Sequence, residues 1–213
     1  SGQITLYKLI ISAFTLLVLT FAISILCFNK TFNLSILALF IAGLIYNIRP
    51  IRAKDIPFLD VISESVNNPI RLFIGWYAVG NNFPHPPLAI LLFFWLLGAF
   101  LMTAKRTAEF KMLGSNGSLY RPTYKYYSLP NLSVFLIFYA VMSSIFFIYI
   151  AVRYKNSLLI SLPFYLITLI WYIKLTYQMK TLVVEPEHIY KYPLFALYIL
   201  FCLFFSFITI LML

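Results

Sequence analysis

The segment 46–60 carries the densest group of charges in an otherwise apolar chain, and it reads YNIRPIRAKDIPFLD. Three of these charges are the cations Arg49, Arg52 and Lys54. Arginine holds phosphate oxygens bidentately, and lysine adds a point charge. The segment therefore predicts a phosphate- or diphosphate-binding loop, although charge that sets the topology of a membrane protein explains the same residues.

A second polar group begins where that segment ends. Asp60, Glu64 and Arg71 fall near one stripe of a helix, and Asn67 and Asn68 flank this stripe. Two carboxylates on adjacent turns repel each other unless a cation lies between them, and either Arg71 or a bound metal ion could supply that cation. We therefore consider Asp60 and Glu64 candidate metal ligands. A shallow helix end that is wetted by lipid headgroups is the alternative.

A third group of charges follows a long apolar run and consists of Lys105, Arg106 and Glu109. If the helix continues through this group, Glu109 shares a face with Lys105 at i, i+4 and with Arg106 at i, i+3. Two cations beside a carboxylate suit a phosphate or diphosphate group. The alternative is a surface ion-pair cluster, which has little energetic weight.

The two histidines are interpreted as loop residues. His85 lies in a proline-rich turn at 84–87, with no other metal-ligand type near it in the sequence. His188 lies with two acids in 185–192, but their spacing matches no recognised metal-ligand pattern. We therefore expect both histidines to lie in exposed connections.

Long apolar runs must position these groups. The chain is 62% hydrophobic and only 10% charged, whereas a soluble domain has about 25% charged residues. Six runs approach the roughly 20 residues that cross a membrane: 9–28, 34–48, 88–104, 132–152, 158–177 and 194–213. A seventh, 70–80, reaches that length if its helix begins near Asp60 and kinks at Pro69. The sequence predicts an all-α, polytopic membrane bundle of about seven transmembrane helices.

The charges are distributed unequally between the two faces that seven spans would create. Of the 16 Lys and Arg residues, 13 fall on the first face, and so do all six acids. The excess of Lys and Arg marks this face as cytoplasmic and places the first residue of the chain inside. Anionic lipid headgroups would attract it. Short basic connections of this kind exclude nucleic acid as the partner, and the bare opposite face disfavours a pore or transporter.

Three segments carry a resemblance to a known family. The run 46–76, with YNIRPIRAKDIPFLDV followed by a polar helix, Arg71 and Gly75-Trp76, resembles the loop after the fourth helix of the UbiA superfamily of membrane prenyltransferases. The opening SGQIT at 1–5 resembles the turn before the family's third helix. The K-R-x-x-E at 105–109 is similar to the second motif of the branch that contains decaprenyl-phosphate phosphoribosyltransferase. The chain would then comprise helices three to nine of a nine-helix fold.

The resemblance implies transfer of a polyprenyl group from its diphosphate to a lipid or aromatic acceptor, assisted by Mg²⁺. In this chain the candidate diphosphate ligands are Arg49, Arg52, Lys54, Arg71, Lys105 and Arg106. The candidate catalytic residues are Asp60, Glu64 and Glu109, of which Asp60 and Glu64 are the metal candidates. The candidate substrate-cavity residues are Tyr46, Asn67, Asn68, Phe73 and Trp76.

Two departures from the family pattern affect these expectations. The family's first motif, NDxxDxxxD, would lie upstream of Ser1, and the second motif lacks its usual aspartates. We therefore expect residues 1–213 to form one membrane domain that lacks the first two helices, is inactive by itself and lies in a prokaryotic inner membrane. Phosphoribosyl transfer to a polyprenyl phosphate remains an alternative, as does a non-enzymatic transporter or scaffold.

Overall fold

The computed structural model describes residues 5–80, 84–114 and 117–212, and within these ranges it contains helices and no strands. The four residues at 1–4, which carry most of the SGQIT resemblance, lie outside the described part. The long helices are α1 (Leu6–Cys27), α2 (Lys30–Asn47), α4 (Asn67–Ala78), α5 (Leu88–Leu113), α7 (Leu129–Tyr154), α8 (Leu162–Tyr177) and α10 (Pro193–Met212). The short elements are η1 (Ala53–Asp55), α3 (Leu59–Ser65), α6 (Gly117–Tyr120), η3 (Pro122–Lys125), η4 (Asn156–Ser161), α9 (Thr181–Val184) and η5 (Pro186–Lys191).

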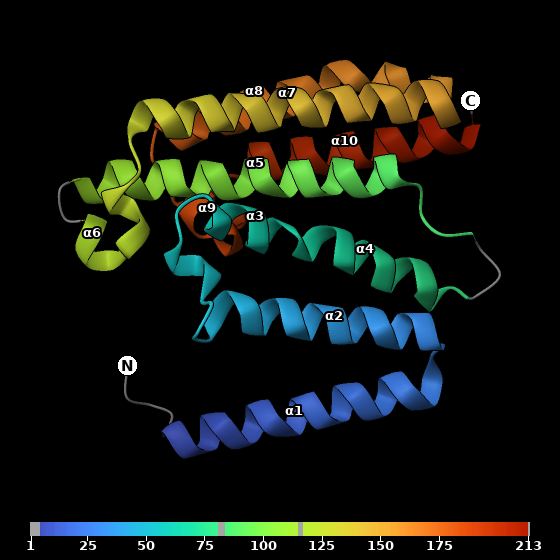
Figure 1. Ribbon diagram of the computed structural model, residues 1–213. Coiled ribbons are helices and arrows are strands. Elements are labelled where there is room, and N and C mark those ends of the chain that lie inside the picture. Colours follow the sequence, from blue (N-terminus) through green and yellow to red (C-terminus); the bar gives the residue numbers. More distant parts are fainter. Residues whose placement is uncertain (1–4, 81–83, 115–116, 213) are drawn as a thin grey trace.

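Six of the described helical segments are long and apolar enough to cross a membrane. They are Leu6–Cys27, Lys30–Asn47, Leu88–Leu113, Leu129–Tyr154, Asn156–Tyr177 and Pro193–Leu211. This finding confirms an integral, multi-pass membrane protein made of α-helices. The helices lie roughly side by side, with η1, α6 and α9 at one end of the bundle and the connection from α7 to α8 at the other (Figure 1). The first end carries the charged segments and is called the charged end below.

Helix α5 is the centre of the bundle and packs most closely against α7 (Figure 1). Ala104 and Ala108 on α5 and Ala140 on α7 belong to one buried cluster, in which Phe100 and Leu136 fill the neighbouring space. Small side chains let two helix backbones approach closely where no aqueous hydrophobic effect drives them together. This packing fixes α5 as the rigid element on which the candidate site is built.

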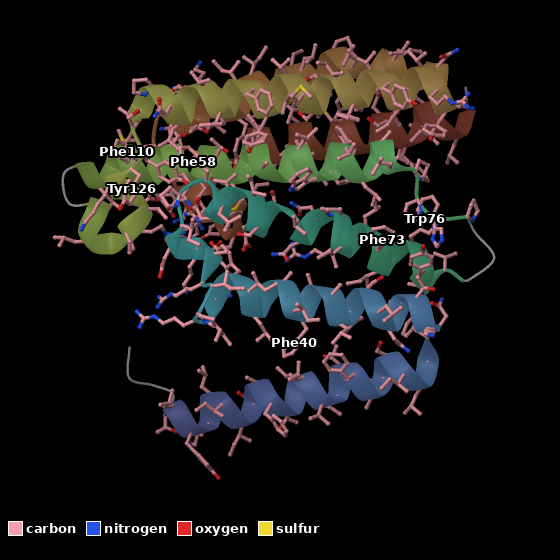
Figure 2. The ribbon with its side chains drawn as sticks, viewed as in Figure 1. Phe40, Phe58, Phe73, Trp76, Phe110 and Tyr126 are labelled. Carbon is pink, nitrogen blue, oxygen red and sulfur yellow. The ribbon has the colours of Figure 1, made fainter. Side chains whose placement is uncertain are left out.

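Helix α1 lies at the edge of the bundle, and in the described part of the chain it packs against its neighbour α2 (Figure 1). Ser24 is its one buried residue in the described part, and it hydrogen bonds Asn33 on α2. Phe21 of α1 meets Phe40 of α2 edge to face, with ring centroids 5.9 Å apart. In Figure 2, Phe40 lies between the two helices. The site described below therefore receives no side chain from α1.

Candidate functional site

The polar helix at 59–78 is interrupted rather than straight. Helix α3 ends at Ser65 and α4 begins at Asn67, with Val66 as the shared cap. Pro69 has no N–H to donate to the carbonyl of Ser65, and its ring crowds that carbonyl, which explains a break in this turn. The kink predicted at Pro69 is thus found three residues before it. Both pieces run in the same direction beside α5 (Figure 1).

A buried ionic network joins α3 to α5 near the charged end. Arg106 Nε donates to Asp60 Oδ2 at 2.8 Å, and Arg106 Nη1 donates to Glu109 Oε2 at 2.7 Å. Asp60 is 0% exposed, Arg106 1% and Glu109 6%. A buried charge is tolerated only when it is paired and hydrogen-bonded. Arg106, rather than Arg71 or a metal ion, therefore supplies the cation that Asp60 requires.

Tyrosines from the connection between α5 and α7 complete this network. The Tyr127 hydroxyl donates to Asp60 Oδ1 and accepts from the backbone N–H of Phe58 at 2.8 Å. The Tyr124 hydroxyl donates to Glu109 Oε2. Figure 2 shows Phe58 and Tyr126 at this end of the bundle. The segment 122–127 is thereby attached to both buried carboxylates.

The two tyrosines remain hydrogen-bond donors at physiological pH. Burial raises the pKa of the Tyr127 phenol, and the charge of Asp60 raises it further. Burial likewise raises the pKa of Tyr124, with a further increase from the charge of Glu109. A phenolate beside a carboxylate in a buried site would be doubly unfavourable. Neither group is therefore suited to act as a base.

The network leaves little room for a ligand. Each Asp60 oxygen already faces a protein group: Oδ1 accepts from Tyr127, and Oδ2 accepts from Arg106. Arg121 Nη1 also lies 3.6 Å from Oδ2. A guanidinium beside a carboxylate also repels a divalent cation. Within the described residues, no three His, Cys, Asp or Glu side chains lie together as a metal site. The donor set around Asp60 consequently does not fit Mg²⁺.

An open cavity of about 330 Å³ lies beside the network, farther along α4 and α5. Its polar lining consists of Glu64, Asn68, Arg71 and Lys105. The rest of the wall is mainly apolar and comes from α5, α8, α9, η5 and α10, through Leu101, Met102, Tyr172, Leu182, Val183, Pro186, Ile189, Phe195 and Ile199. The cavity therefore combines a charged side with a long apolar side.

The order of the polar groups along the cavity follows from the contact between α4 and α5. The Asn68 amide lies directly over Gly98, where a Cβ would be 1.9 Å from Asn68 Nδ2. At about 1.5 Å of rise per residue, Glu64 and Lys105 lie about 6 and 10 Å from this contact toward the charged end. Arg71 lies about 4 Å beyond it on the other side. Two cations therefore bracket the carboxylate and the amide.

Arg71 lies well away from the charged end of the bundle. The sequence places it with the charged face, but it is 12 residues beyond the start of α3, or about 18 Å along the two helices. A helix that started at one membrane surface would bring this position near the middle of a hydrocarbon core about 30 Å thick. A cation at that depth is costly unless it faces a polar cavity, and Arg71 lines one.

The remaining predicted residues lie outside this cavity. Arg52 pairs with Asp55 at 3.0 Å, and Lys54 donates to Asn47 at 3.2 Å. Arg49 is exposed in the same connection. The Tyr46 hydroxyl lies 3.4 Å from Arg106 Nη2, and Asn67 is buried at the break between α3 and α4. Phe73 lines a different cavity, and Trp76 Nε1 donates to the Pro84 carbonyl.

Sequence reasoning missed four residues of this region: Gly98, Arg121, Tyr124 and Tyr127. A signal for three of them was present, because Arg121, Tyr124 and Tyr127 recur every third residue in one connection. Nothing in the sequence indicated that a glycine inside an apolar helix would accommodate the amide of Asn68.

We expect Tyr127→Phe to lower the free energy of unfolding by about 1–3 kcal/mol, because it leaves a buried Asp60 oxygen without a donor. Unfolding of the purified protein by SDS in mild detergent measures this change. Tyr126→Phe is the matched control, since the Tyr126 side chain is 67% exposed. Equal stability of the two variants would contradict the assigned role of Tyr127.

Searches of protein families, of curated proteins and of solved structures find no match to this chain.

Proposed function

We propose that the chain is the larger part of a UbiA-type intramembrane prenyltransferase, which moves a polyprenyl group from its diphosphate to an acceptor. The observation that carries this proposal is the amphipathic cavity. Arg71 and Lys105 suit a diphosphate, and the apolar part of the lining, which includes Leu101 and Ile199, suits an isoprenoid chain. The resemblance of segments 46–76 and 105–109 to the family supports it independently.

In this proposal the two cations stabilise the leaving diphosphate as the allylic C–O bond breaks. The apolar wall excludes water from the resulting carbocation, and its lining includes Tyr172 and Phe195, whose aromatic rings can stabilise a cation. Mg²⁺ is the cofactor that the resemblance implies. Because Asp60 is fully engaged and Glu64 is the one described carboxylate that lines the cavity, we assign no step to the ion.

The charged end would face the cytoplasm of a prokaryotic cell, by the positive-inside rule. Helices α3 and α4 together would make a seventh crossing, because their combined span of about 20 residues matches the hydrocarbon thickness. Arg52, Lys54 and Arg49 would then form a basic entrance loop that attracts the diphosphate from the cytoplasmic surface. They are not among the described residues that line the cavity, so no direct contact is assigned to them.

The test is diphosphate release from geranylgeranyl diphosphate by membranes that contain the natural full-length protein. We expect Arg71→Gln or Lys105→Gln to reduce the rate by about 10²-fold, as removal of one charge-stabilising group does in other enzymes. Lys8→Gln, on the remote helix α1, is the matched control and should retain the rate. Equal activity of all three variants, or no release by the unmodified protein from any prenyl diphosphate, would refute the proposal.

Phosphoribosyl transfer to a polyprenyl phosphate is the second candidate. One observation favours it: the cavity offers two cations but a single carboxylate, which suits capture of a lipid phosphate better than a cluster of metal ions. Diphosphate would then be released from phosphoribosyl diphosphate only when a polyprenyl phosphate is added. Comparing the two donors in the same membranes separates the candidates. Release from neither donor would favour a transporter or scaffold.

A further inference from the structure

A second and larger cavity, of about 560 Å³, lies at the opposite end of the bundle from the ionic network. It is formed by α2, by α4 and by the start of α5 with the preceding connection 84–87. Figure 2 shows Phe73, which lines it, and Trp76 at this end of α4. Its volume falls within the range of about 300–1,000 Å³ that is usual for ligand pockets.

The two cavities occupy different sides of helix α4. Asn68 and Arg71 face the 330 Å³ cavity of the candidate site, called the charged cavity below, whereas Ile70, Phe73 and Tyr77 face this one. Successive helical residues are rotated by about 100°, so residues 68 and 70 point about 200° apart. The second cavity is therefore separated from the proposed transferase site by the body of α4, and a ligand in it would be a different molecule.

The lining of the second cavity contains no Lys, Arg, Asp or Glu among the described residues. Its walls are apolar, through residues such as Leu34, Ala38, Phe73 and Leu91. Polar groups occur as Thr31, Ser35, Tyr77 and His85. An anionic head would find no Lys or Arg among these residues to pair with. The lining therefore selects an uncharged ligand that is mostly hydrocarbon.

The polar end of this cavity is held in place by several hydrogen bonds. Tyr77 is 4% exposed, and its hydroxyl hydrogen bonds His85 Nδ1. Asn29 Nδ2 donates to the Tyr77 carbonyl at 2.8 Å, while Asn29 Oδ1 caps α2. Trp76 Nε1 donates to the Pro84 carbonyl at 2.9 Å. These contacts fix α2, α4 and the 84–87 connection relative to one another and hold His85 at the mouth.

His85 gives this mouth a specific chemistry. When Nδ1 accepts from the Tyr77 hydroxyl, the other ring nitrogen bears the proton and can donate to a ligand oxygen. Aromatic and amphipathic side chains such as Trp76 and Tyr77 lie where a membrane meets water. A ligand with an oxygen at the interface and a chain in the hydrocarbon would satisfy both regions.

We infer that this cavity binds a long-chain lipid alcohol, with its hydroxyl at His85 and its chain between α2, α4 and α5. The inference does not depend on the proposed transferase reaction. A phosphorylated or carboxylated lipid of the same length lacks a counter-charge in this lining and binds more weakly.

The test uses the purified full chain in phosphatidylcholine nanodiscs and geranylgeraniol that carries a diazirine in its chain. After irradiation, peptide mass spectrometry should find the label concentrated on Leu34, Phe73 and Leu91. Unlabelled geranylgeraniol should compete for this labelling, and geranylgeranyl phosphate should not. Label spread evenly over lipid-facing helices such as α1 and α10, or equal competition by the phosphate, would overturn the inference.

Two variants test the same cavity. Ala38→Phe fills it and should abolish the concentrated labelling, whereas Leu37→Phe, at the neighbouring exposed residue that does not line the cavity, should not. His85→Ala removes the proposed donor from an exposed position, while the Asn29 and Trp76 hydrogen bonds still hold this end together. It should weaken competition by geranylgeraniol about fivefold, the equivalent of one hydrogen bond of about 1 kcal/mol. Unchanged labelling in folded Ala38→Phe or unchanged competition in His85→Ala would contradict the assignment.

Discussion

Replacing Arg106 by alanine is expected to lower the free energy of unfolding by about 3–5 kcal/mol, the usual cost of removing one partner from a buried ion pair. Two carboxylates depend on this guanidinium, at 2.8 Å to Asp60 and 2.7 Å to Glu109. Neither can gain compensating water, since Asp60 is 0% exposed and Glu109 6%. Unfolding by SDS in mild detergent measures the loss.

The neighbouring lysine provides the matched control for this prediction. Lys105 lies 4.0 Å from the same glutamate, but its side chain is one-third exposed. Such a pair contributes about 0–1 kcal/mol, so Lys105→Ala should change stability by no more than that. Arg106→Lys should stay strongly destabilised, because an ammonium cannot reproduce two directed N–H donors. If Arg106→Ala unfolded no more easily than Lys105→Ala, the network would not have the structural weight assigned to it.

Helices were predictable from the sequence wherever lipid dictates their length. The run expected at 132–152 is found as Leu129–Tyr154, extended because Ser128 accepts a hydrogen bond from Asn131 as the N-cap. The run expected at 34–48 begins at Lys30, because Asn29 caps it. The short elements α9 and η5 were not predicted. Four to six residues show no clear periodicity, and their form is decided by packing.

Within the candidate site, only contacts local in sequence could be predicted. The helical spacing of Arg106 and Glu109 indicated their pairing, and the structure has it. Asp60 lies 46 residues from Arg106, and Tyr127 lies 67 residues from Asp60. No periodicity connects residues so far apart, so their meeting depends on how α3 and the 122–127 segment pack on α5. For this reason the sequence suggested Arg106 as a diphosphate ligand, whereas the structure places it in a closed network.

Gly98→Ala is expected to displace the Asn68 amide from the lining of the charged cavity while leaving the bundle folded. The new Cβ would lie 1.9 Å from Asn68 Nδ2 and 3.4 Å from Ser65 Cβ, so the amide must rotate away from α5. Overpacking of this kind costs about 1–3 kcal/mol. Gly75→Ala, with nothing within 4 Å of its Cβ, is the matched control. It should stabilise α4 by about 0.5–1 kcal/mol, because alanine favours the helix.

A double-mutant cycle shows whether the amide is the cause of the damage in Gly98→Ala. Asn68→Ala removes the group that the new methyl meets, so the pair Gly98→Ala/Asn68→Ala should be more stable than the sum of the single changes predicts. Directly contacting residues give interaction energies of about 0.5–3 kcal/mol in such cycles. Labelled geranylgeranyl diphosphate, titrated into the same proteins, should bind the double variant as it binds Asn68→Ala alone. A strictly additive cycle would mean that Asn68 does not lie over Gly98, and the order of polar groups along the cavity would then be wrong.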